Sequence, residues 1–193
     1  MHKIQRKGFL FSQSPWTWFA IAVSIVILDL WTKHLASSAF EYNEKKEVFS
    51  FFNLTLRHNT GAAFSFLANA GGWQRWFFTI LTTVVSIVLV VWITRVGQYR
   101  VLEPLGLALV LGGALGNLYD RVTLGYVVDF IEFHWKNRHF FPAFNIADMA
   151  ISCGAALLIF DNLLFSHKRE AGSRDTRAEE SRTKEDQFKR APK

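Results

Sequence analysis

Residues 143–160 have the sequence AFNIADMAISCGAALLIF, an apolar stretch that carries a single acid, Asp148, close to its start. With the few residues that follow, the stretch reaches the roughly 20 apolar residues that a helix needs to cross a bilayer. An ionised side chain in such a span costs roughly 3 kcal/mol on insertion scales. The sequence therefore predicts a membrane helix over about residues 144–165, in which the acid calls for a structural or functional explanation.

Three more stretches have the length and composition of membrane helices. They cover about residues 16–35, 76–94 and 101–119. Half of the 193 residues are hydrophobic and 16% are aromatic, while the formal net charge is +6. Apolar spans with basic flanks are typical of membrane proteins. We therefore predict a mostly α-helical, polytopic membrane protein with one four-helix domain over residues 16–166 and no nucleic-acid partner.

Basic residues predict the orientation of these helices, because Lys and Arg near helix ends favour the cytoplasmic side. Such residues precede helix one, lie in the link between helices two and three, and follow helix four. They are Lys3, Arg6, Lys7, Arg95, Arg100, Lys168 and Arg169. Residues 1–15 and both termini are accordingly expected in the cytoplasm. Residues 167–193 mix charges of both signs and are expected to form a disordered cytoplasmic tail.

The N-terminal stretch also has some features of a cleavable secretory signal. Basic residues precede its apolar run, and the small residues of LASSAF follow. However, Asp29 and Lys33 lie within the run, where a signal peptide should be apolar. We therefore interpret this stretch as a retained first membrane span.

Two segments on the outer side of the membrane have strand-like composition. Residues 41–68 alternate partially and are interrupted by turn residues at 59–61, and residues 126–133 form a second apolar run that contains Asp129. We expect a small extracytoplasmic β-rich platform. Its phenylalanines either dip into the membrane interface or form a small core of their own. They are Phe49, Phe51, Phe52, Phe64 and Phe66.

Two of the acids in the predicted spans have an evident basic partner. Asp29 and Lys33 are four residues apart on one helix face, which favours an intrahelical ion pair. Asp120 is adjacent to Arg121 at the end of helix three, and we interpret these two residues as a bracket that holds the helix end in register. The nearby Gly112, Gly113 and Gly116 allow another helix to approach closely.

Asp129 and Asp148 have no basic partner at helical spacing, and Glu132 adds a further negative charge near Asp129. Pro142 and Asn145 favour a helix start just before Asp148, which lies about 6 Å along the helix from its outer end. Both carboxylates can therefore meet at the outer membrane boundary. Two carboxylates within hydrogen-bonding distance share a proton, so one can activate water while the other polarises an amide carbonyl. This pattern indicates aspartic proteolysis.

Other chemistries fit the sequence less well. Cys153, the only cysteine, has no histidine in its helix, and we interpret it as a buried small residue rather than a nucleophile. His134 and His139 lack the HExxH spacing of zinc hydrolases, and we predict neither a metal site nor an organic cofactor. Three alternatives stay open. A proton-coupled membrane transporter is one, because buried acids also relay protons. The others are a non-catalytic assembly factor and, among hydrolases, a metalloenzyme.

Several short blocks together resemble the lipoprotein signal peptidase family, signal peptidase II. They are DLWTK (29–33), HNTGAAFS (58–65), GGALGNLYDR (112–121), YVVDF (126–130) and FNIAD (144–148). The resemblance spans about residues 16–165, although Leu30 stands where the family usually has Gln. It implies four transmembrane helices with an extracytoplasmic β-cradle in the bacterial inner membrane. It also implies a monomeric aspartic endopeptidase that cuts prolipoproteins just before their diacylglyceryl-modified cysteine.

The resemblance also assigns roles to individual residues. The family's catalytic pair falls on Asp129 and Asp148. Further family positions line or brace the active site, and the glycine-rich third helix is expected to offer a groove for the substrate helix. The bracing positions are Asn59, Gly61, Ala62, Asn117, Asp120, Arg121, Asn145, Asp29 and Lys33. The substrates implied are diacylglyceryl-modified prolipoproteins presented from membrane lipid.

Overall fold

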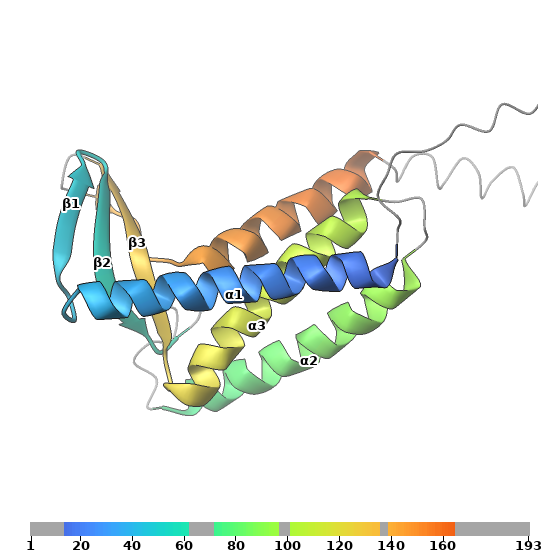
Figure 1. The fold of residues 1–193 in the computed structure, drawn as a ribbon, viewed down its shortest axis with the longest axis horizontal. Coiled ribbons are helices and arrows are strands. Elements are labelled where there is room, and N and C mark those ends of the chain that lie inside the picture. The colour runs from blue at the N-terminus through green and yellow to red at the C-terminus, as the bar shows by residue number, and fades with distance from the viewer. Residues whose placement is uncertain (1–13, 62–71, 97–100, 136–138, 165–193) are drawn as a thin grey trace, which may run out of the picture.

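The computed structural model describes residues 14–61, 72–96, 101–135 and 139–164. They include four helices: α1 (Pro15–Ala39), α2 (Trp73–Arg95), α3 (Leu102–Thr123) and a fourth helix (Ile146–Leu164). Each of the four is long and apolar enough to cross a membrane. The helices run side by side as one bundle (Figure 1). The prediction of four membrane helices is therefore confirmed.

The helices begin and end at other residues than the hydropathy suggests. Helices α1 and α3 each continue four residues past their predicted ends, because polar and small residues outside the bilayer still support helix. The fourth helix begins at Ile146, two residues later than predicted. Phe144 instead forms an antiparallel bridge with Ile131, so the chain is still extended there. Apolar length thus identifies the span, while capping and pairing set its ends.

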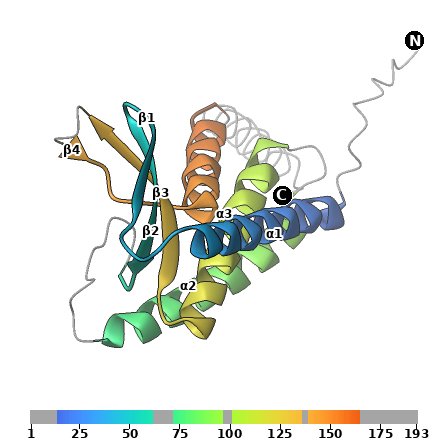
Figure 2. The ribbon, with the colours of Figure 1, turned by 60° about the vertical axis from the view of Figure 1, so that its left-hand side comes forward.

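A small sheet lies at one end of the bundle (Figures 1 and 2). Its strands are β1 (Lys45–Phe49), β2 (Phe52–Asn59), β3 (Val127–Trp135) and β4 (His139–Phe140). They pair in the order β1-β2-β3-β4, and all pairs are antiparallel. The predicted β-rich segment therefore forms a sheet with the second strand-like segment. The predicted residues Ala62, Phe64 and Phe66 lie outside the described part of the chain, as does the predicted tail.

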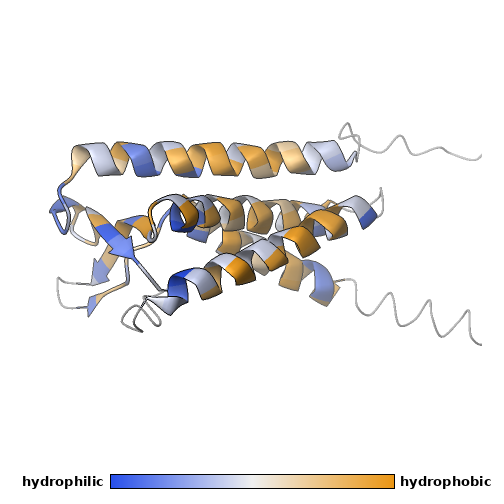
Figure 3. Ribbon diagram, turned by 90° about the horizontal axis from the view of Figure 1, so that it is seen from below, coloured by the Kyte–Doolittle hydropathy of each residue, from blue (hydrophilic) through white to orange (hydrophobic). Residues whose placement is uncertain are grey.

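Helix α3 is the most buried of the four helices. Its residues Leu107, Ala108 and Leu111 pack against α1 and α2 in the main apolar cluster. The outward faces of the other helices carry large exposed apolar side chains, and hydrophobic residues run along the middle of the bundle (Figure 3). An apolar belt of this kind is the surface that a bilayer would cover.

The glycines of α3 are the points of closest helix contact, as the sequence predicts. A Cβ atom added to Gly116 would lie 2.5 Å from Asp29 Oδ2 of α1. A Cβ atom added to Gly113 would overlap the backbone oxygen of Ala147 in the fourth helix. The glycine surface is therefore filled by α1 and the fourth helix. The expectation that it offers a groove for a substrate helix is wrong at these positions.

Candidate active site

Asp129 lies in β3, and an irregularity in β2 brings Asn59 to its side of the sheet. Leu54 pairs with Ile131 but Arg57 pairs with Asp129, so β2 uses one residue more than β3 over this interval. An extra residue of this kind is a β-bulge, which shifts the following side chains to the other face. As a result, Asn59 Nδ2 donates to Asp129 Oδ2 at 3.1 Å.

Asn145 caps the fourth helix and at the same time connects the two candidate acids. Its Oδ1 accepts a hydrogen bond from the backbone N–H of Asp148 at 2.9 Å, and its own N–H donates to Asp148 Oδ2 at 3.4 Å. This reciprocal pair is a capping box, which explains locally why an acid is favoured three residues after the cap. Asn145 Nδ2 donates to Asp129 Oδ1 at 2.8 Å. The helix start predicted at Asn145 is confirmed, with Asn145 as its cap, and the same side chain bridges Asp148 to Asp129.

Asn117 of α3 also contacts one of the two candidate acids. Its Nδ2 donates to Asp148 Oδ1 at 2.8 Å, and its Oδ1 accepts from Lys33 Nζ at 2.9 Å. Lys33 forms ion pairs with Asp29 Oδ2 at 2.7 Å and with Asp120 Oδ2 at 2.9 Å. The predicted Asp29–Lys33 pair is therefore confirmed, and Lys33 also connects α1 to α3. A buried ammonium with three such acceptors has its donors satisfied.

Asp29 and Asp120, the two acids that pair with Lys33, each accept a hydrogen bond from the backbone next to one of the candidate acids. Asp29 Oδ1 accepts from the N–H of Ala147, and Asp120 Oδ2 accepts from the N–H of Val128. These distances are 2.9 and 3.1 Å. Each N–H belongs to the residue immediately before a candidate acid. The Lys33 cluster thus fixes the backbone of β3 and of the fourth helix at the same time.

Arg121 has a different partner from the one that adjacency suggests. Its Nη2 donates to the backbone oxygen of Gly61 at 3.0 Å, and its guanidinium lies over the ring of Phe78 at 5.5 Å. Its sequence neighbour Asp120 pairs with Lys33 instead. The Asp120–Arg121 bracket is therefore wrong as a pair, because successive helical residues project in different directions.

Arg75, which the sequence analysis missed, holds the end of α3. Its guanidinium donates to the backbone oxygens of Arg121 and Val122, both at 2.9 Å. These carbonyls belong to the last turn of the helix, where acceptors have no partner within the helix. The signal in the sequence that could have predicted this contact is the basic residue in the first turn of α2.

A cavity of about 620 Å³ opens beside the candidate acids, between α2, α3 and the fourth helix. Its polar end includes Asp148, Asn59, Asn117 and Arg121. Its apolar wall is formed mainly by α2 and the fourth helix. The apolar lining includes Phe78, Leu81, Val85, Phe141, Phe144 and Met149. The arrangement suits a ligand that is polar at one end and apolar along its length.

Cys153 lines the same cavity and is exposed. The prediction that it is a buried core residue is therefore wrong. It faces the cavity because the space between α2 and the fourth helix is not filled by side chains at this level.

The electrostatics of Asp129 differ from those of an ordinary carboxylate. Burial, and after it the negative charge of Asp148, raises the pKa of Asp129 to about 7. Glu132 is not among the causes of this raised pKa, contrary to the expectation that it adds a negative charge near Asp129. It lies on the opposite face of β3, where it pairs with Lys45 at 2.7 Å and accepts from Asn53 at 3.2 Å.

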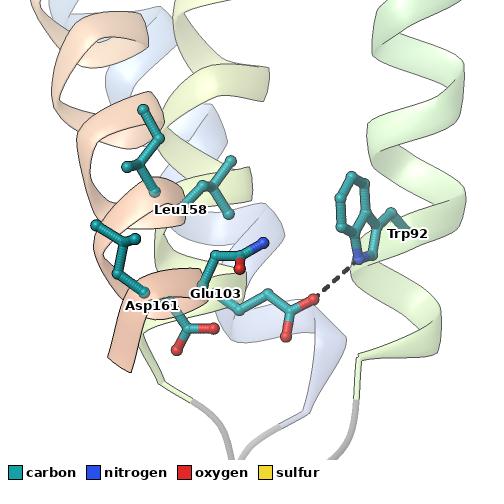
Figure 4. A pocket seen from close by; sticks show the side chains of 7 residues that line it. Trp92, Glu103, Leu158 and Asp161 are labelled. Atoms are coloured by element: carbon teal, nitrogen blue, oxygen red, sulfur yellow. Dashed lines mark hydrogen bonds between the residues drawn. The ribbon is translucent and has the colours of Figure 1, made fainter. Parts of the chain in front are cut away.

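Two other features of the described residues bear on alternative sites. No group of three or more His, Cys, Asp or Glu side chains in this part of the chain could hold a metal ion. A second, smaller cavity lies near the other end of the bundle (Figure 4). There Trp92 Nε1 donates to Glu103 Oε1 at 3.1 Å, and Asp161 lies nearby. It shares no lining residue with the cavity beside Asp148.

Most of the predicted site residues come together in one network. It comprises Asp129, Asp148, Asn59, Gly61, Asn117, Asp120, Arg121, Asn145, Asp29 and Lys33. A buried acid, Asp129, and a half-buried acid, Asp148, are bridged by an asparagine beside a cavity in a bundle of membrane-length helices, an arrangement that fits the class of membrane aspartic peptidases. The family to which the chain belongs follows from comparison with known proteins.

The family model of signal peptidase (SPase) II, Peptidase_A8, matches residues 21–164. The lipoprotein signal peptidase of Cellvibrio japonicus is 52% identical over 163 residues, which are 84% of this chain and 95% of the relative. That of Acinetobacter baumannii (strain ATCC 17978) is 50% identical over 175 residues, 90% and 99% of the two chains. The chain belongs to the signal peptidase II family. It is a bacterial multi-pass membrane enzyme, an aspartic peptidase that removes signal peptides from prolipoproteins.

The fold agrees with solved structures. A structure described as a bacterial membrane enzyme, determined by the in meso method at 2.3 Å resolution, has a TM-score of 0.72 and 34% sequence identity. It covers 82% of this chain, and 94% of that chain is matched. Together with the named relatives, this similarity favours peptide hydrolysis over proton-coupled transport and over a non-catalytic role.

Proposed function

We propose that Asp129 and Asp148 are the catalytic pair of this peptidase. The observation that carries the proposal is the bridge through Asn145, which donates to Asp129 and caps the helix that carries Asp148. Asn117 and Asn59 donate to the remaining carboxylate oxygens, so each acid is oriented by amides. Amide donors fix a carboxylate in place without the strong ionising effect of a direct cation.

Hydrolysis then divides between the two acids. The ionised acid takes a proton from water as the water oxygen bonds to the carbonyl carbon of the substrate, and the protonated acid donates to the carbonyl oxygen. The tetrahedral intermediate collapses by breaking the C–N bond: the acid that took the proton from water gives it to the leaving nitrogen, and the other acid takes a proton back from a hydroxyl of the intermediate as the carbonyl re-forms. A pKa near 7 for Asp129 supports this role, because the pair then holds one proton near neutral pH. The proton belongs to the pair as a unit.

The remaining residues position this pair. Lys33, Asp29 and Asp120 hold the backbone before each acid, and Arg121 holds Gly61 beside Asn59. Gly61 N–H in turn donates to Asn59 Oδ1 at 3.0 Å. Ala62, the remaining predicted site residue, lies outside the described residues. No metal or organic cofactor is required for these steps.

The substrate is a prolipoprotein whose cysteine carries an S-diacylglyceryl group, and the cleaved bond lies just before that cysteine. The mainly apolar cavity supports this assignment, because it offers an apolar surface next to Asp148. We place the active site at the outer, periplasmic face of the inner membrane, with residues 1–15 and 167–193 in the cytoplasm. The enzyme works as a monomer in which residues 16–166 form the peptidase domain.

The test is cleavage of a synthetic diacylglyceryl precursor by purified enzyme, followed by mass spectrometry. Asp129→Asn and Asp148→Asn should each reduce kcat at least roughly 100-fold while the thermal unfolding transition is retained. Asp161→Asn is the matched control, since it makes the same change near the other end of the fourth helix. Normal turnover by either of the first two variants would disprove the catalytic pair.

A further inference from the structure

One face of β3 is turned toward the helices near its start and is exposed near its end. Side chains alternate along a strand, so Asp129, Ile131, Phe133 and Trp135 share a face. Asp129 is 2% exposed, but Phe133 is 41% and Trp135 is 68% exposed. The turn between β1 and β2 lies next to this end of β3. It extends beyond the start of the fourth helix, on the side away from α2 (Figures 1 and 2). Among the residues that the structure describes, no helix covers the end of this face.

Stacked aromatic rings cover this end of the sheet. Phe51 lies nearly parallel to Phe133 with ring centroids 6.4 Å apart, and Phe49 stacks on Phe51 at 5.8 Å. Phe52 pairs with Phe133 in the sheet, with ring centroids 5.4 Å apart. We call Phe49, Phe51, Phe52 and Phe133 the aromatic lip. Its outermost rings, Phe49 and Phe51, are 59% and 53% exposed.

The aromatic lip is continuous with the lining of the cavity beside Asp148. Phe133 contacts Phe144 with ring centroids 5.8 Å apart, and Phe144 lines that cavity. An apolar path therefore leads from the edge of the sheet to the site. The opposite face of the sheet is polar at the same level, because Glu132 pairs there with Lys45 and Asn53. The sheet is thus amphipathic where it leaves the bundle.

A contiguous exposed apolar patch marks a binding surface, and aromatic rings are the side chains that favour the boundary between lipid and water. The surface next to the lip is the apolar belt of the fourth helix, where Met149 is 46% exposed. We propose that the aromatic lip inserts into bilayer lipid beside the fourth helix and holds the polar end of the cavity at the depth of the lipid headgroups. This inference does not depend on which residues cut the substrate.

The direct test measures the depth of single labels in vesicles of phosphatidylethanolamine and phosphatidylglycerol. Phe51→Cys and Glu47→Cys are made in a Cys153→Ser background, which removes the only native cysteine. Glu47 is the matched control, because it is exposed on the same hairpin and pairs with Asn53 on the polar face. A spin label at 51 should collide preferentially with oxygen, and one at 47 with a water-soluble nickel complex. Equal preference for nickel at both positions would overturn the proposal.

The kinetic test uses enzyme with an unmodified Cys153. The double variant Phe49→Ser, Phe51→Ser should raise KM for a vesicle-embedded precursor roughly three- to tenfold and leave kcat unchanged, since the acids are untouched. Leu at both positions should restore KM, because it restores apolar surface. An unchanged KM in the Ser variant would overturn the proposal. Failure of the catalytic pair would appear separately, as cleavage by Asp129→Asn with the label depths unaltered.

Discussion

Asp129 is a buried acid outside the membrane-spanning helices, and its environment makes stability depend on pH. Its pKa rises from 3.8 to about 7 on folding, so the folded protein holds this proton more tightly than the unfolded chain. Stability from this group is therefore greatest below about pH 4 and decreases as pH rises toward 7. At about 1.4 kcal/mol per pKa unit, the full effect is up to about 4 kcal/mol.

Replacing this acid by its neutral amide isolates the effect. Asp129→Asn should unfold at a higher temperature than the wild type at pH 8, because it removes a buried charge, and the difference should vanish near pH 4. Thermal melts in detergent across this range measure it, with Asp161→Asn as the control. A difference that is the same at both pH values would show that packing or hydrogen bonding, rather than titration, separates the two proteins.

At the scale of elements, the contact of α1 with α3 depends on Gly116. Because an added Cβ would lie 2.5 Å from Asp29 Oδ2, Gly116→Ala must displace a carboxylate that pairs with Lys33 and holds Ala147. We expect a loss of about 1–3 kcal/mol in unfolding free energy, as for other overpacked sites. Activity should fall as well, because the displaced acid supports the backbone before Asp148.

Chemical denaturation of purified protein measures this loss. Tyr119→Ala is the control, since Tyr119 lies on the same helix but is 54% exposed. A Gly116→Ala protein as stable and active as the Tyr119→Ala protein would show that α1 can move aside without cost.

The elements that depend on local sequence were predictable, and those that depend on distant pairing were not. Apolar length identified four helices, and spacing identified the Asp29–Lys33 pair, because both signals lie within one segment. The ion pair of Lys33 with Asp120 joins two helices, so residue order gives no sign of it. The bulge that turns Asn59 toward Asp129 likewise appears only when β2 is paired with β3. Adjacency suggested a partner for Arg121 that the structure does not provide.

At the scale of the whole molecule, the sheet lies at one end of four membrane-length helices (Figure 1). The acid pair lies at the same end, because Asp129 belongs to β3 and Asp148 to the first turn of the fourth helix. An even number of spans places the start of α1 and the end of the fourth helix on one side, and the basic residues around Arg95 and Lys168 favour the cytoplasm for that side. The β1–β2 turn at Ser50 should then face the periplasm. Hydrolysis there would act on precursors only after export.

Reporter fusions test this orientation in living cells. A green fluorescent protein after Lys193 should fluoresce, because it folds in the cytoplasm, and alkaline phosphatase inserted at Ser50 should be active, because it needs the oxidising periplasm. The Asp129→Asn variant with the same fusions controls for any effect of the activity itself. A non-fluorescent protein after Lys193 together with an inactive phosphatase at Ser50 would show the opposite orientation. The acids would then lie on the cytoplasmic side, where they could act on precursors before export is complete.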